Sequence, residues 1–462
     1  MIISQLPELF VQRERALLGP RFDAMFSYSG QGAVRGASVN ALRCTPQQFA
    51  ALADFPLEAS PFCASAFVVP QPDWKPGRHP YHHAGAFYAQ EPSASAPAAL
   101  LDVHPGMRVA DLCAAPGGKT SQLAAALAGH GVLLANEFVA ARAEVLRQNL
   151  ERMGVTNAIV TNEDTARLAA AYPGQFDRIL VDAPCSGEGM FRKIPEARDE
   201  WSENNVKICA VRQAEILREA WKTLRPGGLL IYSTCTFNRL ENEGSLEGLL
   251  AEAGEEIVES TAFDCPPAWG VVCGRVGPFR TFRFYPHRTR GEGFFAAVAR
   301  KVSDGGSRVR VPKSRRTIFA PAGRRECAEL SRWVAEPERM RFAAVADVYY
   351  AYYESQYEAV KMLAESLRVI ASGVAMGQIF KERLKPDHAL AMFCGLDRGA
   401  VPVAELSEEE ALRFLRKQEA EAAAFAEGMN LVTHGGAALG FAKRIQNRVN
   451  NMYPNSLRIF NL

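Results

Sequence analysis

Two cysteines at the ends of two expected strands are the residues of this chain best suited to covalent chemistry. Cys185 lies in VDAPCSGEGMF, residues 181–191, and Cys235 lies in YSTCTF, residues 232–237. A thiolate is strongly nucleophilic even when only a fraction of the thiol is ionised at neutral pH. Most cysteines are small buried hydrophobes, but the carboxyl ends of neighbouring strands open onto one crevice. We therefore predict that these two thiols share a reactive site.

Asp182, three residues before Cys185, adds a carboxyl group to this site. One reaction that needs such a thiol is methylation of carbon 5 of cytosine. Carbon 5 is too weak a nucleophile to attack a methyl sulfonium directly, so the ring must first accept a nucleophile at carbon 6. Thiolate addition pushes electron density onto carbon 5 and the ring nitrogen, which a carboxylic acid can hydrogen-bond or protonate. Methyl transfer then requires loss of the carbon 5 proton and of the thiol. A second group near carbon 5 would help, which gives Cys185 a part in elimination.

The segment DLCAAPGGKT, residues 111–120, has the pattern of a strand end, a glycine turn and a helix start. Glycine lets the backbone approach a ligand closely, and the carboxyl end of a strand in an α/β sheet is where nucleotide-like ligands bind. The segment matches neither GxGxxG nor the P-loop spacing, which disfavours a dinucleotide or ATP.

Two acidic residues follow the next two expected strands. Glu137 ends the second strand, where a carboxylate holds a ribose diol in such folds. Asp164, beyond the third strand, can accept a hydrogen bond from an adenine amino group. Either acid alone is as often a solvated cap as a ligand contact, so the prediction rests on their joint position beside the glycine turn.

The elements that must position these residues form an alternating pattern between residues 100 and 300. Short Val/Ile/Leu-rich runs alternate with longer amphipathic stretches, which is typical of a parallel α/β sheet. Helices are expected from near Lys119, over 139–154 and from about Ser202 to Leu224, and a further Ala/Glu-rich helix is expected near 404–428. The expected strands are 107–112, 131–136, 157–161, 176–182, 228–233 and 293–299.

Composition excludes several classes of protein. The 462 residues are 48% hydrophobic and 23% charged, as in soluble globular proteins of several domains. No apolar stretch is long enough to cross a bilayer, and the first residues predict a helix and not a secretion signal, so we expect a cytoplasmic protein. The ten cysteines form no CxxC pair and the eight histidines no ligand cluster, which disfavours a disulfide scaffold and a bound metal.

Four motifs together carry a family resemblance: DLCAAPGGKT, DAPCSGEGMFRK, YSTCTF and ENE. They resemble the RNA cytosine-5 methyltransferases of the Nol/Nop/Sun superfamily, and more narrowly the bacterial RsmF type that acts on 16S ribosomal RNA. The resemblance extends over nearly the whole chain, through GRHPYHHAGAFYAQEPSA (77–94), PHRTRGEGFFAA (286–297) and GFAKRIQNRVNNMYP (440–454).

The resemblance implies an α/β fold with a Rossmann-like class I S-adenosylmethionine-dependent methyltransferase core. In that family the cysteine matching Cys235 attacks the base, the one matching Cys185 assists release, and the acid matching Asp182 lies beside the base. The implied cofactor is S-adenosylmethionine, with no metal. The residues expected to hold it are Cys113, Ala114, Ala115, Pro116, Gly117, Gly118, Lys119, Glu137, Arg142, Asp164 and Asp182.

Five segments are expected along the chain. A small N-terminal α/β cap over 1–75 precedes a catalytic domain over 76–300. A basic linker over 301–316 then leads to an intermediate domain over 317–380 and a PUA-like RNA-binding domain over 381–462. Basic residues on both sides of the C-terminal region are expected to neutralise RNA phosphates: Arg308, Arg310, Lys313, Arg315, Arg316, Lys443, Arg444, Arg448 and Arg458.

Three functions remain open at this point: a 16S ribosomal RNA methyltransferase acting on RNA or the 30S subunit, a transfer RNA methyltransferase, and a ribosome-assembly RNA-binding protein. Two thiols, an acid and a glycine turn argue against the third as the sole role. DNA is a disfavoured partner, because DNA cytosine methyltransferases use the Pro-Cys thiol as nucleophile and need no second one. No membrane contact is expected, and the resemblance implies a monomer.

Overall fold

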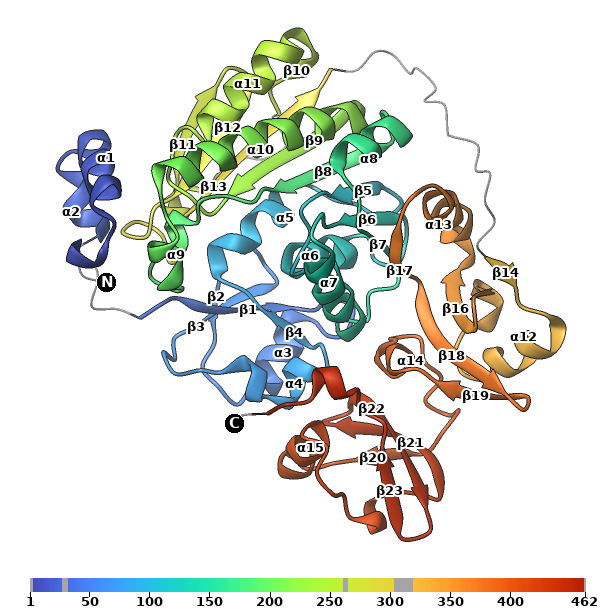
Figure 1. Cartoon of the computed structure of the whole chain (residues 1–462). Coiled ribbons are helices and arrows are strands. Elements are labelled where there is room, and N and C mark those ends of the chain that lie inside the picture. Colours follow the sequence, from blue (N-terminus) through green and yellow to red (C-terminus); the bar gives the residue numbers. More distant parts are fainter. Residues whose placement is uncertain (1–2, 27–31, 261–264, 303–318, 461–462) are drawn as a thin grey trace.

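The computed structural model describes residues 3–26, 32–260, 265–302 and 319–460 of the chain (Figure 1). These residues form four β-sheets, of four, ten, five and four strands in chain order. No helix within the described ranges is long and apolar enough to span a membrane. Most of the expected basic linker, with its five basic residues from Arg308 to Arg316, lies outside them.

The central ten-stranded sheet confirms the expected α/β core. Its strand order is β11-β12-β13-β9-β8-β5-β6-β7-β17, with β10 paired to β13. All six expected strands are present, and β5 to β9 run parallel. Their bounds are β5 Arg108–Asp111, β6 Val132–Asn136, β7 Ala158–Thr161, β8 Phe176–Asp182, β9 Leu224–Thr234 and β13 Phe294–Lys301; the remaining strands are β10 Ile257–Val258, β11 Val272–Val276, β12 Phe279–Phe284 and β17 Val369–Ser372.

Helices cover both faces of this sheet, which gives three layers (Figure 1). One face carries α8 (Thr165–Ala171), α10 (Glu203–Thr223) and α11 (Glu243–Ala253), and the other carries α5 (Ala96–Leu100), α6 (Gly118–Ala126) and α7 (Ala140–Arg152). The expected helices correspond to α6, α7 and α10. Ser202 caps α10, because its side chain accepts a hydrogen bond from Asn205 N at 3.1 Å.

The chain order of the sheet reverses between β8 and β5, since β6 and β7 continue on the far side of β5. Ligands of open α/β sheets bind outside the carboxyl ends of the strands at such a switch point. The glycine turn after β5 and the two cysteine segments after β8 and β9 therefore open onto the same edge.

The N-terminal region builds a small sheet of order β2-β3-β1-β4 against the core. Two further helices, α1 and α2, pack with Phe191, Trp201 and Phe237 beside the cysteine segments. The bounds are α1 Glu8–Leu18, α2 Arg21–Phe26, β1 Arg35–Val39, α3 Pro46–Leu52, β2 Glu58–Ala59, β3 Ala66–Val69, α4 Pro80–His83 and β4 Phe87–Ala89; α9, Glu196–Asp199, follows the first cysteine segment. β4 extends this sheet beyond residue 75.

The region expected as an intermediate domain divides between two sheets. A five-stranded sheet comprises β14 (Ala320–Pro321), β15 (Met340–Val345), β16 (Val348–Tyr353), β18 (Val374–Phe380) and β19 (Arg383–Pro386), with α12 (Arg324–Ser331) beside it. Between β16 and β18, however, α13 (Glu354–Ser366) packs into the central core and β17 pairs with β7 as an edge strand. Part of this region is thus built into the catalytic core.

The C-terminal sheet has the order β20-β21-β22-β23. Its elements are α14 His388–Met392, β20 Val403–Glu405, α15 Glu408–Leu415, β21 Gly428–His434, β22 Ala437–Ile445 and β23 Arg448–Asn451. The prediction of a single helix near 404–428 is wrong, because the start of this range belongs to β20 and the helix α15 ends at Leu415. Ser407 and Glu410 form a capping box that starts α15, and Lys417, with a φ of 53°, ends the helical path.

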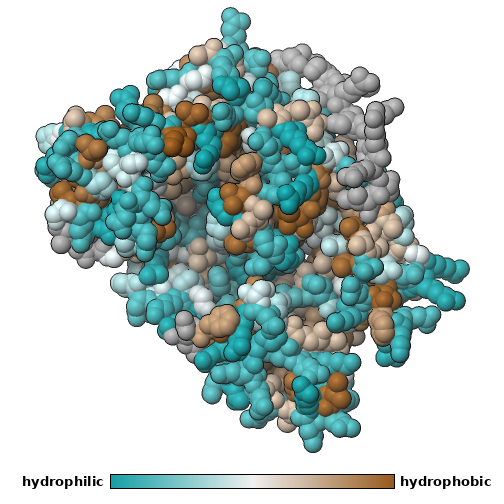
Figure 2. All heavy atoms as spheres, in the orientation of Figure 1, coloured by the Kyte–Doolittle hydropathy of each residue, from teal (hydrophilic) through white to brown (hydrophobic). Residues whose placement is uncertain are grey.

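The surface of the face shown in Figure 2 is mostly hydrophilic, with apolar residues in small separate groups around a hollow. Such scattered apolar residues are ordinary for a folded surface.

Leu217→Ala is expected to lower the free energy of unfolding by about 3 kcal/mol, because Leu217 is fully buried between α10 and the sheet and its removal leaves a cavity. Val211 lies on the same helix with 62% of its surface exposed, so Val211→Ala is the matched control, expected to change stability by less than about 0.5 kcal/mol. Urea unfolding followed by tryptophan fluorescence measures both. Equal effects would show that α10 does not pack as described.

Candidate active site

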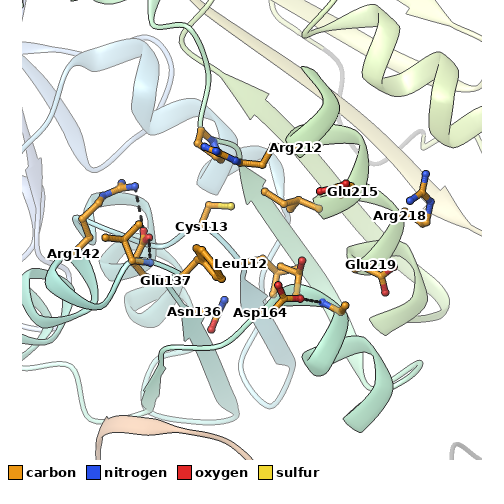
Figure 3. A pocket seen from close by; sticks show the side chains of 16 residues that line it. Leu112, Cys113, Asn136, Glu137, Arg142, Asp164, Arg212, Glu215, Arg218 and Glu219 are labelled. Atoms are coloured by element: carbon orange, nitrogen blue, oxygen red, sulfur yellow. Dashed lines mark hydrogen bonds and ion pairs between the residues drawn. The ribbon is translucent and has the colours of Figure 1, made fainter. Parts of the chain in front are cut away.

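Two cavities adjoin at the carboxyl edge of the central sheet. The first, of about 560 Å³, lies beyond the ends of β5, β6 and β7 and against α10 (Figure 3). The second, of about 490 Å³, contains the glycine turn and both strand-end cysteines. Cys113, Arg142 and Pro184 line both cavities, so the two open into one another.

The first cavity has mixed apolar and charged walls, with two carboxylates held in place at the strand ends. Glu137 Oε1 accepts a hydrogen bond from Val139 N at 2.9 Å, and its Oε2 lies 3.4 Å from Arg142 Nη1. Asp164 caps α8, with Oδ1 accepting from Ala166 N at 2.7 Å. Figure 3 shows both acids on one side of the cavity and the polar side chains of α10 on the other.

The glycine turn leaves room where a side chain would collide. Gly117 has a φ of 112°, in the region that favours glycine, and a Cβ on Gly118 would lie 3.1 Å from the ring of Tyr88. The turn is held from outside, because Tyr88 Oη and Asn149 Nδ2 both donate to Pro116 O, at 3.2 and 2.9 Å, and Arg142 Nη2 donates to Ala115 O at 2.9 Å. The start of α6 therefore approaches the cavity with backbone alone.

Asp111, the last residue of β5, is a buried acid with one oxygen to spare. Its Oδ2 accepts from Thr120 Oγ1 at 2.8 Å, whereas Oδ1 has no hydrogen-bond partner within the described part of the chain. Burial, followed by the neighbouring charge of Asp182, raises the pKa of Asp111 to about 7. A cation entering the cavity would favour its ionised form.

Asp182, at the end of β8, is held by a cation and a hydroxyl. Lys119 Nζ lies 2.7 Å from Asp182 Oδ2, and Ser233 Oγ donates to Oδ1 at 2.7 Å. The Lys119 ammonium also lies 5.0 Å from the centre of the Phe294 ring, a distance that suits a cation–π contact. The acid and its lysine are thus fixed together at the floor of the second cavity.

The two thiols form a hydrogen-bonded pair. Cys185 Sγ and Cys235 Sγ are 3.2 Å apart, and both side chains are partly exposed to the cavity. The hydrogen bond with Cys235, together with burial, raises the pKa of Cys185 well above its ordinary value. The raised pKa favours the protonated form of Cys185, and either sulfur can donate the hydrogen bond between the two thiols.

The structure brings together every residue that the sequence predicts for the site. Cys185, Cys235, Asp182 and the turn residues line the second cavity, Glu137 and Asp164 line the first, and Cys113 and Arg142 line both. Sequence reasoning missed Asp111, Tyr88, Gln90 and Phe138, which also line the cavities. Asp111 carried a signal, because it is the acid that ends the strand before the glycine turn, whereas the other three did not.

Three protein-family models match the chain in succession. The N-terminal domain of 16S rRNA methyltransferase RsmF matches residues 6–92, 16S rRNA methyltransferase RsmB/F matches 98–300, and the PUA domain of methyltransferase RsmF matches 401–459. The ribosomal RNA small subunit methyltransferase F of Salmonella arizonae is 33% identical, in an alignment that covers 98% of this chain and 96% of that protein. The chain belongs to the RsmF family of 16S rRNA methyltransferases. Its core is an S-adenosylmethionine-dependent methyltransferase.

Solved structures agree with this membership. A methyltransferase homologue from Pyrococcus horikoshii is 28% identical, covers 65% of this chain and 100% of that one, and has a TM-score of 0.54. NSun6 from Pyrococcus horikoshii, solved with SFG, covers 66% of this chain and 100% of that one with a TM-score of 0.55, and at 20% identity it shows the fold alone.

The residues present fit the cofactor of the RsmF family. S-adenosylmethionine carries a ribose diol, an adenine amino group and a positively charged methionine end. The first cavity offers Glu137 and Asp164 to the nucleoside, and the free oxygen of Asp111 in the second suits a cationic group. A Cβ on Gly118 would crowd Tyr88 and Gln90 on the wall of the second cavity. The carboxyl groups and the glycine turn therefore match the hydrogen-bonding groups, the charge and the size of the cofactor.

S-adenosylmethionine affinity is expected to rise about fivefold between about pH 5.5 and pH 7.5. The pKa of Asp111 is raised to about 7, so this group is mostly neutral at the lower pH, and its ionised form, which attracts the cationic cofactor, appears as the pH rises. Isothermal titration calorimetry of the wild type and of Asp111→Asn measures the effect, and the variant should bind weakly with no rise. The same dependence of S-adenosylmethionine affinity on pH in both proteins would show that Asp111 takes no part in cofactor binding.

Proposed function

We propose that this chain methylates carbon 5 of a cytosine in 16S ribosomal RNA through a covalent bond between Cys235 and carbon 6 of the base. The observation that supports this most directly is the pair of thiols 3.2 Å apart in a cavity that adjoins the cofactor cavity. A methyltransferase that acts on an amino group has no need of a thiol, because the amine attacks the methyl group itself.

Addition is the first step. Cys235, whose sulfur lies 3.2 Å from that of Cys185, attacks carbon 6 as a thiolate, a carbon–sulfur bond forms, and the electron pair of the carbon 5–carbon 6 bond moves toward carbon 5 and the ring nitrogen. The fixed pair of Asp182 and Lys119 lies at the floor of the same cavity, where it can hydrogen-bond the ring nitrogen as charge develops there.

Transfer and elimination follow. When bound, S-adenosylmethionine would supply a methyl group on its sulfonium. Carbon 5 would bond to that methyl as the methyl–sulfur bond breaks, and the cofactor would leave as a neutral thioether. The carbon 5 proton then leaves to water, the carbon 5–carbon 6 double bond forms again, and the bond to Cys235 breaks. Cys185 holds its proton 3.2 Å from the departing sulfur and donates it, and the proton released from carbon 5 balances the one that Cys185 gives up.

The substrate assignment rests on the family and on exposed basic residues at the C-terminus. Lys443, Arg448 and Arg458 lie exposed on the C-terminal sheet region, whose sequence matches the PUA model, and we infer that they contact RNA phosphates. A paired cytosine hides its reacting face, so the target must be unpaired or flipped out. We infer that one chain acts on the decoding region of the 30S subunit in the cytoplasm.

Transfer of radiolabelled methyl from S-adenosylmethionine is expected to yield 5-methylcytidine in 30S subunits or naked 16S RNA, and none in bulk transfer RNA. Nucleoside analysis after incubation with the three substrates side by side makes this measurement. Label in transfer RNA alone would support the proposed reaction but contradict the assignment of 16S ribosomal RNA as the substrate. No label in any of the three substrates would favour an RNA-binding role in ribosome assembly.

Cys185→Ala is expected to accumulate a protein–RNA adduct that survives a denaturing gel, because addition through Cys235 proceeds while the proton donor for elimination is missing. Cys235→Ala should form no adduct and lose turnover by at least about a thousandfold. The role assignment would be reversed if Cys235→Ala kept its activity and Cys185→Ala lost it without an adduct.

A further inference from the structure

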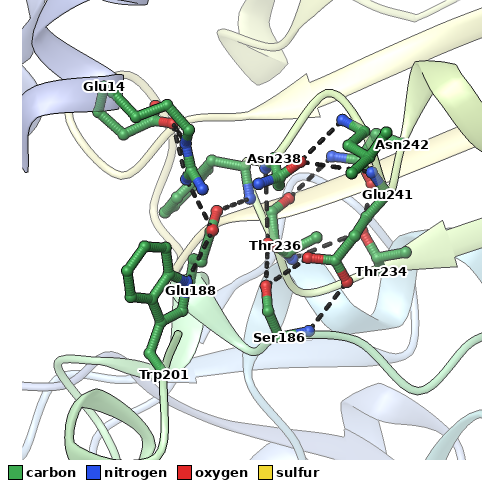
Figure 4. Close-up of polar contacts among 12 residues, drawn as sticks. Glu14, Ser186, Glu188, Trp201, Thr234, Thr236, Asn238, Glu241 and Asn242 are labelled. Carbon is green, nitrogen blue, oxygen red and sulfur yellow. Dashed lines mark hydrogen bonds and ion pairs between the residues drawn. The ribbon is translucent and has the colours of Figure 1, made fainter. Parts of the chain in front are cut away.

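Glu241 is fully buried, and its carboxylate lies against Ser186, the residue that follows Cys185 (Figure 4). Its Oε2 accepts hydrogen bonds from Ser186 N and from Gln213 Nε2, both at 2.9 Å, and its Oε1 accepts from the Ser186 hydroxyl. Among the described residues no cation forms an ion pair with it. Burial raises the pKa of this carboxyl, and the hydrogen bonds that Ser186 and Gln213 donate lower it. In its ionised form, a buried carboxylate held only by donated hydrogen bonds is a weakly screened negative charge.

The hydrogen bonds of Glu241 reach the two thiols unequally. Ser186 directly follows Cys185, so Glu241 binds the backbone of that segment. Its path to Cys235 is longer and runs through two hydroxyls, since Ser186 Oγ lies 2.9 Å from the hydroxyl of Thr236, the residue after Cys235. Glu241 is therefore bonded directly to the segment of Cys185 and only indirectly to that of Cys235.

Other bonds hold the two cysteine segments together whatever the charge of Glu241. Gly189 N donates to Cys235 O at 2.8 Å, and Phe237 N donates to Glu188 Oε2 at 3.1 Å. Glu188 is itself paired with Arg13 at 2.6 Å and accepts from Trp201 Nε1 at 3.0 Å (Figure 4). The charge of Glu241 can thus be removed while this second set of contacts maintains the distance between the sulfurs.

Building on the proposed function, we propose that Glu241 is a positioning residue whose buried negative charge holds the proton of the thiol pair on Cys185 and leaves Cys235 as the nucleophile. A negative charge nearby disfavours a second one on Cys185. The pKa of Cys185 is raised chiefly by its hydrogen bond with Cys235 and by burial, and Glu241 adds to these causes. Cys185 thereby keeps the proton that it donates when the bond from Cys235 to carbon 6 breaks.

The test compares Cys235→Ser with the double variant Cys235→Ser/Glu241→Gln. The rate at which iodoacetamide alkylates Cys185 is followed by peptide mass spectrometry from about pH 6 to pH 10. The midpoint for Cys185 is expected to fall by about one pH unit when the charge of Glu241 is removed. Glu247, exposed on α11, is the control: Glu247→Gln in the same background should leave the midpoint unchanged.

An unchanged midpoint in a double variant that keeps its melting temperature and its S-adenosylmethionine affinity would overturn the proposal and leave Glu241 a structural role. Glu241→Asp in the Cys235→Ser background keeps a carboxyl group and changes its hydrogen bonds to Ser186 and Gln213. An unchanged midpoint there supports the proposal. A midpoint that falls by about one pH unit overturns it, because the hydrogen bonds and not the charge would then control the protonation of Cys185. This comparison decides the matter if Glu241→Gln does not fold.

Measuring these alkylation profiles requires neither RNA nor turnover, so their result does not depend on the outcome of the methyl-transfer test. With Cys235 intact, Glu241→Gln should lower kcat by about tenfold and change KM for RNA by less than about twofold, since substrate contacts are untouched. A rise in KM with kcat unchanged would place Glu241 in RNA binding and contradict the proposal.

Discussion

The parallel pairing of β8 with β9 is the interaction on which the site depends. Asp182 lies opposite Ser233 in this register, and the segments that follow carry Cys185 and Cys235 from neighbouring strand ends to within 3.2 Å of one another. A slip of one residue would turn every side chain of the strand to the other face of the sheet and break the contact between Ser233 and Asp182. The register of β8 and β9 therefore determines where the two cysteine segments begin and how close the two sulfurs lie.

Charge is the second organising constraint around the thiols. Among the buried acids around the site, four are accommodated in two ways. Glu188 and Glu292 each pair with an arginine, whereas Glu91 and Glu241 are satisfied by hydrogen-bond donors alone. Because the arginine that meets Glu188 belongs to α1, the N-terminal helices are bonded directly to the segment that carries Cys185. Cap and catalytic core share one polar network.

Much of the fold and site could be predicted from the sequence because their signals are local. Buried strands of the central sheet are continuous apolar runs, so all six were found, the five parallel ones and antiparallel β13, and a thiol at the end of such a run stands out. Glu241 could not be assigned, because its role arises from contacts with Ser186 and Gln213, 55 and 28 residues away. The helix expected over 404–428 failed for the opposite reason, since Ala and Glu favour helix locally while Ala404 pairs in a sheet with Val432.

The addition of β17 to the central sheet also closes an edge. Without it, β7 would present a row of unpaired backbone groups, which is a template for pairing with another chain. The same segment brings α13 over apolar residues of the core, so a fragment that ended at the last catalytic strand would expose both an open edge and a hydrophobic face. The middle region therefore cannot be removed without exposing the catalytic core, whereas the described residues after 400 contribute no strand to the central sheet.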